Sequence, residues 1–521
     1  MSILKLVEDR PTPSAVYNWR IYLLAAVASC ASCMIGYDSA FIGQTIELSS
    51  FKKEFHFDEW SDSKVNLISA NIVSTYQAGA FFGALFAYPA GYYLGRKWGL
   101  LIAAAVFTLG SGLMLGANGD RGLGLMYGGR VLAGLGVGAG SNLTPIYISE
   151  LSPPAIRGRL YGVSQTLPPS HKQWIIPFAI QLIPAGLMLI GALMIRESPR
   201  WLFSRGRREE AVKNLCWIRQ LPESDIYMIE EIAGIDQALE EQKGSIGTGF
   251  WKPFQAAGTN KKVLWRLFLG FMLFFWQNGS GINAINYYSP DIFKSIGIHG
   301  SKNQLMTGIF GVVKTAVTIV WLLYLIDQLG RRVLLIYGAI AGAICLWIIG
   351  AYIKVVDPEH NPTDHITPTG YMAIVFFYVY TACYTPSWNG TPWVMNSEMF
   401  DPNMRSLAQA VASASNWLWN FLISRFTPQM LDKMQYGTYF FFASLMVIAA
   451  FFVFFLYPET KGVPLEVMDR LFDTKPVWRA HGKIMSQLHE DERHFREEIQ
   501  DSGVFAGKEN VQFVEQRDVA A

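Results

Sequence analysis

Long apolar runs alternate with short polar connections through most of the chain. Each run is long enough to cross the hydrocarbon core of a bilayer as a helix, which takes about 20 residues. The pattern therefore predicts an all-α membrane protein with eleven spans, near residues 21–44, 67–90, 98–117, 125–149, 174–195, 265–290, 303–326, 333–354, 370–396, 406–430 and 436–457.

Polar residues gather in three longer segments, 45–66, 196–262 and 458–521. The middle segment is rich in arginine and lysine, which favour the cytoplasmic side, and it has the apolar spacing of short amphipathic helices. Five regions are predicted: a cytoplasmic amino-terminal segment (1–20), a first helical bundle (21–195), a cytoplasmic helical loop (196–262), a second helical bundle (263–457) and a cytoplasmic tail (458–521), largely disordered after about residue 480.

Composition supports this class and excludes several others. Of 521 residues, 51% are hydrophobic and 16% are charged, which is too apolar for a soluble chain of this length. The net charge of +2 gives no indication of a nucleic-acid partner. The five cysteines have no paired or metal-ligand spacing, and the chain has no phosphate loop or nucleophile elbow. We expect no cofactor, no metal and no enzymatic activity.

The two halves of the chain repeat the same charged motifs in the same order. Two parallel bundles that face each other can open a midplane site to alternate sides of the membrane. The repeat therefore predicts two pseudo-symmetric bundles, and its matching pairs are Gly95-Arg96-Lys97 with Gly330-Arg331-Arg332, Glu150 and Arg157 with Glu398 and Arg405, and Glu197 with Glu459.

One span of the first half is missing from this pattern. Basic loops favour the cytoplasmic side, so the chain must cross an even number of times between Arg157 and Arg196. Only one apolar run, 174–195, lies between them. The connecting residues 163–173 are polar and contain two prolines, which excludes a transmembrane helix. We predict that the fifth span is absent and that the chain as written does not transport.

Carboxamides and glycines interrupt an apolar run between Gln277 and Tyr288. Such groups are costly at membrane depth unless they face a cavity or a partner. Carboxamides present donors and acceptors that suit a hydroxyl-rich ligand. The alternative is that they only join neighbouring helices. We interpret the stretch as a polyol site, with Gln277, Asn278, Asn283 and Tyr287 as its candidate residues.

Asp38 and Arg130 lie at similar depths in the first and fourth spans. An unpaired charge at that depth is costly, so we expect the two side chains to pair. A carboxylate beside an arginine can exchange a proton when the site alternately wets and dries. The competing interpretation is a fixed buried pair.

Four further polar or aromatic side chains are candidates for substrate contact. Lys314 lies in the middle of a span and suits a substrate carboxylate, although a partner within the protein is the stronger alternative. Trp393 can stack on the C–H face of a ring, or simply pack in the core. Asn416 and Asn420 are four residues apart, so they share one helix face and contact either substrate or a neighbouring helix.

Charged residues at the inner ends of the spans are candidates for a cytoplasmic gate. We expect ion pairs between the bundles, which close the cytoplasmic side in the outward-facing state; anchoring of the topology by positive charge is the alternative. The candidates are Arg96, Glu150, Arg157, Glu197, Arg200, Arg331, Arg332, Glu398, Arg405 and Glu459.

These motifs together resemble the sugar porter family of the major facilitator superfamily, over about residues 20–470. Residues 276–290 and 385–393 look most like the fungal quinate permeases. The motifs that carry the resemblance are Gly129-Arg130 with Gly134, Gly136 and Gly138; Pro145 through Gly158; Glu197-Ser198-Pro199-Arg200; Gln277 through Tyr288; Asp327 through Arg332; Pro392-Trp393 through Arg405; and Pro458 through Gly462.

The resemblance implies twelve spans, cytoplasmic termini and transport of a polyhydroxylated ring across the plasma membrane. It also implies proton coupling, because proton-coupled members have the pair formed here by Asp38 and Arg130. The sequence departs from the family at Tyr92, where an aspartate is usual, and at Arg196, where a proline is usual. It also lacks the fifth span, with its sugar-binding glutamine.

We therefore expect a monomeric secondary transporter that imports quinate, or a related polyhydroxylated ring compound or sugar, together with protons. The expected partners are the substrate, protons and the lipid bilayer, without nucleic acid. The alternatives are a hexose facilitator or other sugar transporter, a nutrient sensor on the same fold, and an inactive shortened product.

Overall fold

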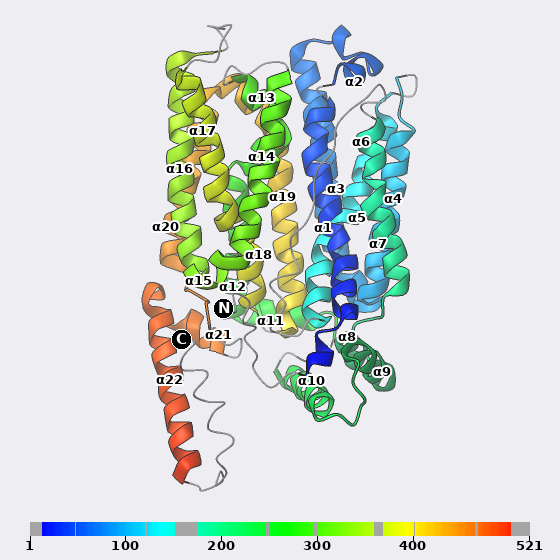
Figure 1. Ribbon diagram of the computed structural model, residues 1–521, viewed down its shortest axis with the longest axis vertical. Coiled ribbons are helices and arrows are strands. Elements are labelled where there is room, and N and C mark those ends of the chain that lie inside the picture. Colours follow the sequence, from blue (N-terminus) through cyan, green and yellow to red (C-terminus); the bar gives the residue numbers. More distant parts are fainter. Residues whose placement is uncertain are drawn as a thin grey trace.

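The computed structural model describes residues 13–501, except 47, 120–121, 152–174, 246, 248, 296–300, 359–367, 401 and 464–466. The described chain is helical, and its long helices form two bundles that stand side by side (Figure 1). The amino-terminal half supplies one bundle and the carboxyl-terminal half supplies the other.

The first bundle is built from long helices that are apolar on most sides. An internal proline, Pro89 in one helix and Pro145 in another, is accommodated because neighbouring helices pack around it. The helices of this half are α1 (Trp19–Ile46), α2 (Ser49–Glu54), α3 (Asp62–Tyr93), α4 (Arg96–Leu115), α5 (Gly124–Leu151), α6 (Ile175–Ile180) and α7 (Leu182–Met194).

The second bundle contains several interrupted helices. Gly281 separates two of them with a φ of +83°, a conformation that glycine adopts without steric cost. Two short π-helical turns, η4 and η5, interrupt others. The elements are α12 (Lys261–Gly279), α13 (Ile282–Ser295), α14 (Ser301–Val320), η4 (Trp321–Leu325), α15 (Ile326–Leu329), α16 (Arg331–Val356), α17 (Pro368–Tyr384), η5 (Thr385–Asn389), α18 (Thr391–Glu398), α19 (Pro402–Met434) and α20 (Tyr436–Leu456).

The helices outside the two bundles gather at one end of the molecule, which we call the basic end (Figure 1). Leu202, Leu215 and Met228 form part of their own small apolar core. The tail was predicted to lose order after about residue 480, but the structure has a 25-residue helix, α22, there. The helices at this end are α8 (Pro199–Ser204), α9 (Arg208–Arg219), α10 (Ile226–Ser245), α11 (Lys252–Thr259), α21 (Met468–Asp473) and α22 (Val477–Asp501).

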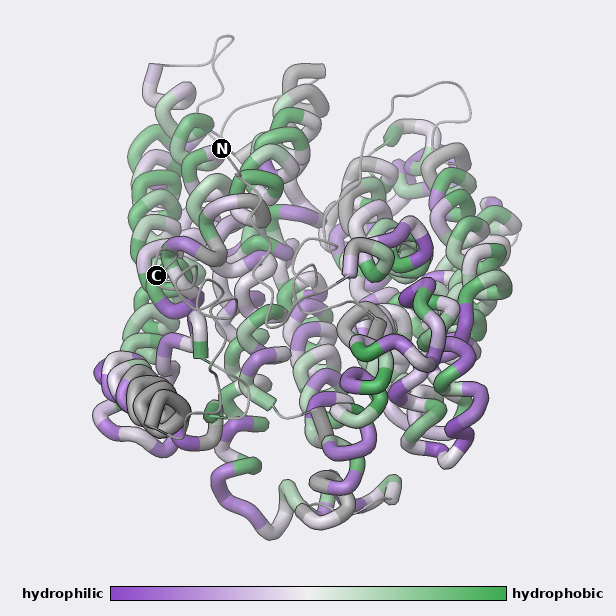
Figure 2. The backbone as a smooth tube through the Cα atoms, turned by 60° about the horizontal axis from the view of Figure 1, so that its bottom comes forward, coloured by the Kyte–Doolittle hydropathy of each residue, from purple (hydrophilic) through white to green (hydrophobic). Residues whose placement is uncertain are grey.

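The outer surface of both bundles is strongly apolar. Phe86, Ile190 and Phe451 are 61%, 60% and 61% exposed, which suits contact with lipid chains. Hydropathy follows the same division, with hydrophobic bundles and hydrophilic residues gathered at the basic end (Figure 2). By length and composition alone, four of the described helices can cross a membrane: Trp19–Gly43, Arg96–Leu115, Arg331–Val356 and Tyr436–Leu456.

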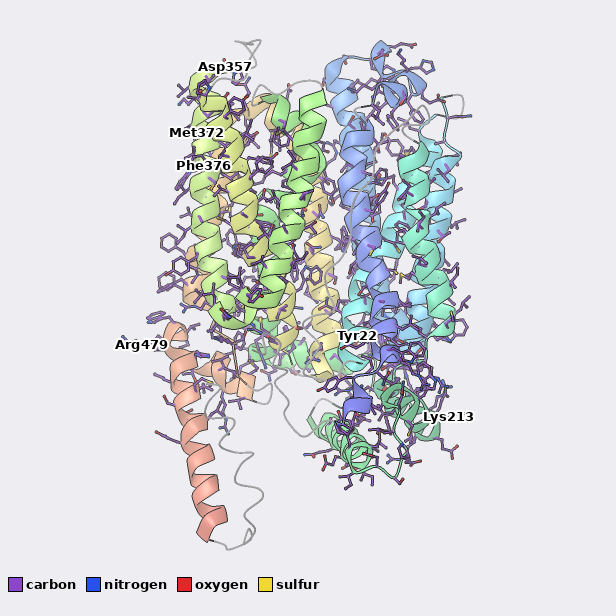
Figure 3. All side chains as sticks on the ribbon, in the orientation of Figure 1. Tyr22, Lys213, Asp357, Met372, Phe376 and Arg479 are labelled. Carbon is purple, nitrogen blue, oxygen red and sulfur yellow. The ribbon has the colours of Figure 1, made fainter. Side chains whose placement is uncertain are left out.

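The bundles run the full distance between two polar ends. Lys213 lies among the helices of the basic end, and Asp357 lies at the opposite end, after α16 (Figure 3). Met372 and Phe376 lie along the outer side of the second bundle between these ends.

The packing of α7 in the first bundle matches that of α20 in the second. Helix α7 packs against α1 and α4, as α20 packs against α12 and α16. Helix α19 behaves differently, because it belongs to the second bundle and packs extensively along α3 of the first. The contact between α3 and α19 therefore joins the bundles.

Glycines allow α3 and α5 to approach backbone to backbone. A Cβ added at Gly79 or at Gly83 would lie 2.2 Å from a carbonyl oxygen, of Val131 or Leu135 respectively. Small residues at such crossings are typical of membrane helix pairs. The close crossing fixes the position of Arg130, which precedes Val131 on α5.

Candidate functional site

Four amides and one lysine form a continuous hydrogen-bonded chain in the second bundle, which we call the amide chain. Lys314 Nζ donates to Asn286 Oδ1 at 3.3 Å, and Asn286 Nδ2 donates to Asn283 Oδ1 at 3.3 Å. Asn283 Nδ2 donates to Asn278 Oδ1 at 2.6 Å, and Asn278 Nδ2 donates to Asn416 Oδ1 at 3.2 Å. All four bonds point the same way, so each polarises the next. The sequence analysis did not select Asn286 as a site residue.

Gln277 lies beside this chain and is held by the π-helical turn η5. Its Nε2 donates to the carbonyl oxygens of Trp388 and Asn389, at 2.8 and 3.0 Å. A π-helical turn leaves carbonyl groups without their usual intrahelical partner, which is why these two are available. Gln277 Oε1 is buried and has no hydrogen-bond partner among the described residues. It is an acceptor that suits a ligand hydroxyl.

Trp393, at the start of α18, is half-buried next to α12. Its ring packs edge-on against Phe274 with the centroids 4.5 Å apart. The contact holds the indole in a fixed position, as a stacking surface for a ring requires.

Asp38 and Arg130 form a fully buried ion pair in the first bundle. Arg130 Nη1 is 2.5 Å from Asp38 Oδ1, and both side chains are 0% exposed. Arg130 also donates from Nε to the carbonyl oxygen of Ile72 at 2.9 Å, and it lies 4.6 Å from the ring centroid of Tyr76. Asp38 and Arg130 therefore pair, as their similar depths in the membrane spans predicted.

Tyr287 and Asn420 meet where the two bundles touch. Asn420 Nδ2 donates to the Tyr287 hydroxyl at 3.4 Å. Asn420 Oδ1 is buried without a hydrogen-bond partner in the described part of the chain. With its side-chain amide turned to satisfy its neighbours, Gln77 of α3 accepts from the same Tyr287 hydroxyl at 3.1 Å, and this glutamine was not predicted as a site residue. No periodicity or motif in the sequence points to this glutamine.

Glu197 caps the N-terminus of α4, at the basic end of the first bundle. Its carboxylate accepts from the backbone amides of Arg96 at 2.9 Å, Lys97 at 3.1 Å and Ser198 at 2.9 Å. A carboxylate at a helix N-terminus satisfies amides that have no intrahelical partner. Burial raises the pKa of Glu197, against the lowering effect of these amides and of the Arg96 charge.

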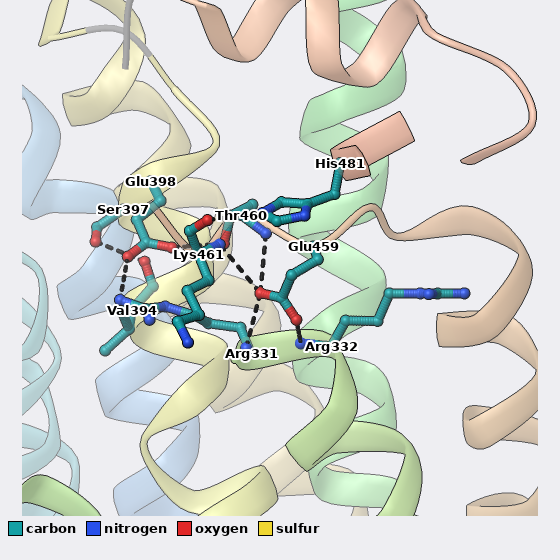
Figure 4. Close-up of polar contacts among 9 residues, drawn as sticks. All are labelled: Arg331, Arg332, Val394, Ser397, Glu398, Glu459, Thr460, Lys461 and His481. Atoms are coloured by element: carbon teal, nitrogen blue, oxygen red, sulfur yellow. Dashed lines mark hydrogen bonds and ion pairs between the residues drawn. The ribbon is translucent and has the colours of Figure 1, made fainter. Parts of the chain in front are cut away.

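Glu459 caps the N-terminus of α16 in the second bundle, as Glu197 caps α4 in the first (Figure 4). It accepts from the backbone amides of Arg331 at 2.8 Å and Arg332 at 2.9 Å. The Arg331 side chain pairs with Glu398 at 2.9 Å, and Thr460 Oγ1 donates to the same carboxylate at 2.6 Å. Six of the ten predicted gate residues thus meet, two in the first half and four in the second: Arg96 with Glu197, and Arg331, Arg332, Glu398 and Glu459. The contacts lie within each bundle, whereas the sequence analysis expected ion pairs between bundles.

The remaining gate candidates are only partly described. Arg200 is exposed on α8, and Arg405 is half-buried on α19. The side chain of Glu150 and all of Arg157 lie outside the described residues.

Tyr92, at the position where the family usually has an aspartate, contacts an arginine through its ring. The guanidinium of Arg205 lies 4.0 Å from the centroid of the Tyr92 ring. Trp201 Nε1 donates to the Tyr92 carbonyl oxygen at 3.0 Å. A cation–π contact therefore ties α3 to the end of α8 at the position where the sequence departs from the family.

These features define a class of protein. Two helical bundles that have lipid-suited exteriors and buried polar residues, including an ion pair inside the first bundle, form a membrane transporter. A family model described as "Sugar (and other) transporter" matches residues 24–168 and 161–472. The chain belongs to this family of transporters.

Curated relatives resemble the chain along its whole length. A probable quinate permease of Aspergillus niger is 70% identical over 538 aligned positions, covering 99% of this chain and 99% of the relative. A probable quinate permease of Aspergillus fumigatus is also 70% identical, over 535 positions and 99% of each chain.

Solved structures support the same fold. The proton:xylose symporter XylE bound to 6-bromo-6-deoxy-D-glucose superposes with a TM-score of 0.71 at 28% identity, covering 87% of this chain and 99% of that one. XylE from E. coli in a partially occluded inward-open conformation gives a TM-score of 0.67 at 27% identity, over 86% and 100% of the chains. The fold is that of the major facilitator superfamily.

Proposed function

We propose that the chain is a proton-coupled transporter of quinate or a closely related polyhydroxylated carboxylate. The observation that carries the proposal is the amide chain of the second bundle, which ends in a lysine. Amides and orphaned acceptor oxygens recognise hydroxyl groups, and the lysine recognises a carboxylate. The 70% identity to relatives described as probable quinate permeases supports the same substrate.

Lys314 distinguishes an anionic substrate from a neutral sugar. Its described hydrogen-bond partner is the neutral Asn286, at 3.3 Å. A lysine at membrane depth without a carboxylate among its described partners is costly, and an anionic ligand removes that cost. From the sequence, a partner within the protein was the stronger alternative for Lys314. The neutral Asn286 amide accepts a hydrogen bond from the lysine but does not balance its charge.

Asp38 and Arg130 supply the proton site. Oδ2 of Asp38 is buried with no hydrogen-bond partner among the described residues, so it is the oxygen that takes up a proton. Protonation leaves Arg130 without a compensating charge, which changes the energy difference between states. Similarity to a structure described as a proton:xylose symporter is consistent with this role.

The basic end faces the cytoplasm in this proposal, in the plasma membrane, and the protein acts as a monomer. Positively charged loops favour the cytoplasmic side, and the basic segment 196–262 lies at that end. The bundles 21–195 and 263–457 rock about the site between them, as alternating access requires. The caps formed by Glu197 and Glu459 keep the inner end of each bundle rigid while the bundles move.

We also propose that the first bundle lacks one helix, giving eleven spans in place of twelve. The family match divides into two pieces that overlap at residues 161–168, just before the run 174–195. The alignment with the Aspergillus niger relative spans 538 positions against 521 residues, so at least 17 positions have no residue here. The described helices of the first half contain a counterpart of α20, namely α7, but none of α19.

Uptake measurements test both parts of the proposal. The chain is expressed in a transport-deficient cell beside a restored chain, in which the missing segment of the Aspergillus niger relative is inserted after Gly162. We expect the restored chain to accumulate labelled quinate in a proton gradient, and the chain as written to show no uptake. Comparable uptake by both forms would contradict the need for the missing helix. Absence of quinate uptake by the restored chain at normal surface expression would contradict the substrate.

A neutral hexose is the second candidate substrate. The observation that favours it is the similarity to XylE bound to a deoxy-glucose derivative. Labelled glucose, measured in the same cells with unlabelled quinate as competitor, separates the two. Glucose uptake that quinate does not inhibit would favour the hexose.

A further inference from the structure

Gln77 lies at the boundary between the two bundles and has no exposed surface. With its amide oriented to satisfy its neighbours, the nitrogen donates to the carbonyl oxygens of Ser74, at 3.2 Å, and Val73. The oxygen accepts from the Tyr287 hydroxyl at 3.1 Å. A side chain of the first bundle thus holds a candidate substrate residue of the second.

The same Val73 carbonyl also serves the ion pair. Arg130 Nη2 donates to it at 3.4 Å, while Arg130 Nη1 holds Asp38 at 2.5 Å. Gln77 and Arg130 therefore share one acceptor. A hydrogen-bonded line runs from Asp38 through Arg130, the Val73 carbonyl and Gln77 to Tyr287.

Tyr287 connects this line to the candidate substrate site. Its hydroxyl accepts from Asn420 Nδ2 at 3.4 Å, and Asn420 Oδ1 has no hydrogen-bond partner among the described residues. The Tyr287 backbone also lies against α1, because a Cβ added at Gly43 would be 1.9 Å from its carbonyl oxygen. The helix that carries Asp38 and the side chain of Gln77 thus both meet Tyr287.

We propose that Gln77 is a positioning residue that transmits the protonation of Asp38 to the substrate site through Tyr287. The proposal rests on the proposed proton coupling and adds the route by which it reaches the substrate. When Asp38 takes up a proton, Arg130 loses its ionic partner and binds the backbone carbonyls more strongly. Competition at the Val73 carbonyl then displaces the Gln77 amide, and the Tyr287 hydroxyl loses its acceptor.

Other groups around Asp38 do not offer an equivalent route. The charged and titratable groups that face it are Arg130 on α5, Tyr76 on α3 and Tyr37 on its own helix. Helix α7 packs against α1 and has no titratable residue. The Tyr76 hydroxyl is buried without a hydrogen-bond partner in the described part of the chain, so it relays no proton-dependent bond.

The test measures quinate affinity by calorimetry on purified protein, in the chain as written and in the restored chain, at acidic and at alkaline pH. The variants are Gln77→Leu, Tyr287→Phe and the two combined. A buried hydroxyl left without its partner predicts that Gln77→Leu weakens affinity by about five- to tenfold. The double variant should be no weaker than Tyr287→Phe alone, because both changes remove the same bond.

Gln181 provides a matched control. It is a second glutamine of the first bundle with no exposed surface, and its side-chain amide has no hydrogen-bond partner among the described residues. Gln181→Leu should leave affinity and its pH dependence unchanged. Gln77→Glu should keep the acceptor for Tyr287 and so retain more affinity than Gln77→Leu.

The pH dependence distinguishes transmission from simple structural support. We expect the dependence of affinity on pH to be reduced at least threefold by Gln77→Leu. Additive effects of Gln77→Leu and Tyr287→Phe, or an unchanged pH dependence in Gln77→Leu, would overturn the role of Gln77 alone. A pH-independent affinity in the unsubstituted protein would overturn the proton coupling itself, and transmission with it.

Discussion

Replacing Lys314 by glutamine tests how the site recognises a carboxylate. Glutamine keeps an N–H donor next to Asn286, on a side chain one atom shorter than that of lysine, while the positive charge is lost. A substrate carboxylate then loses a charge-assisted hydrogen bond, which contributes about 1.5–3 kcal/mol. At about 1.4 kcal/mol per factor of ten, quinate affinity should fall by roughly ten- to a hundredfold.

A neutral hexose provides the internal comparison. Because the glutamine still donates a hydrogen bond, hexose affinity should change by about threefold or less. The assay is concentration-dependent uptake of labelled quinate and glucose by the restored chain, with surface expression measured in the same cells. Lys354→Gln, on α16 and exposed, is the matched lysine control and should alter neither substrate.

Equal losses for quinate and hexose would refute this reasoning. Lys314 would then stabilise the amide chain without touching a carboxylate, as the alternative interpretation of the sequence holds. The assignment of quinate would in that case depend on similarity to the relatives alone.

Three further changes test the remaining parts of the site. Asp38→Asn in the restored chain should abolish accumulation against a gradient while exchange of labelled for unlabelled substrate continues; accumulation in a proton gradient would disprove the coupling role. Alanine at Gln277, Asn283 or Trp393 should weaken uptake affinity by roughly ten- to a hundredfold each, since a lost partner costs about 1–3 kcal/mol; three unchanged affinities would place the site elsewhere. Glu459→Ala should remove about 1–2 kcal/mol of helix capping and lower the thermal unfolding midpoint, and an unchanged midpoint would show that the cap is dispensable.

Much of this architecture could be predicted from the sequence. Membrane spans are marked by long apolar runs, because lipid offers no partner to backbone or polar groups. The pairing of Asp38 with Arg130 followed from depth alone, since two opposite charges at one level of a bundle lower each other's cost. The amides between Gln277 and Tyr288 were visible because polar residues interrupt an apolar run.

The contacts between distant helices could not be predicted. Gln77 and Tyr287 meet only because α3 and α13 lie together in space. The local sequence pattern of neither helix predicts that contact. The charged motifs led us to predict ion pairs between the bundles, whereas the described contacts of Glu197 and Glu459 lie within each bundle. Glu459 accepts from backbone amides of its own bundle, because the free amides and partial positive charge of a helix N-terminus also stabilise a carboxylate.

Comparison of the two halves indicates which surface the proposed missing helix would cover. Glu197 and Glu459 cap α4 and α16 in the same way, and α7 stands to α4 as α20 stands to α16. If the first half lacks a counterpart of α19, as we propose, the caps form without it. Helix α19 instead covers α3, so its counterpart would cover α14, the helix that corresponds to α3.

Residues of α3 and α14 can be matched by their distance in sequence before Gly95 and Gly330, the glycines that begin the repeated charged motif. Gln77 in the first half corresponds to Val312 in the second, and their exposed fractions are 0% and 59%. A Cβ added at the adjacent Gly311 would meet no atom within 4 Å. The face of α14 around these residues is thus open where the matching face of α3 is buried.

A spin label measures whether the restored helix covers this face. With a label at Val312, we expect collisions with dissolved oxygen, which concentrates in lipid, to fall when the helix is restored, because the position moves from lipid into a helix contact. A label at Trp98, which is 53% exposed on α4, should give the same oxygen accessibility in both forms. Unchanged accessibility at Val312 would mean that the restored segment packs elsewhere, and the repeat would not describe the first bundle. A fall at both positions would point to a general change of the protein, because only the Val312 face corresponds to the face that α19 covers.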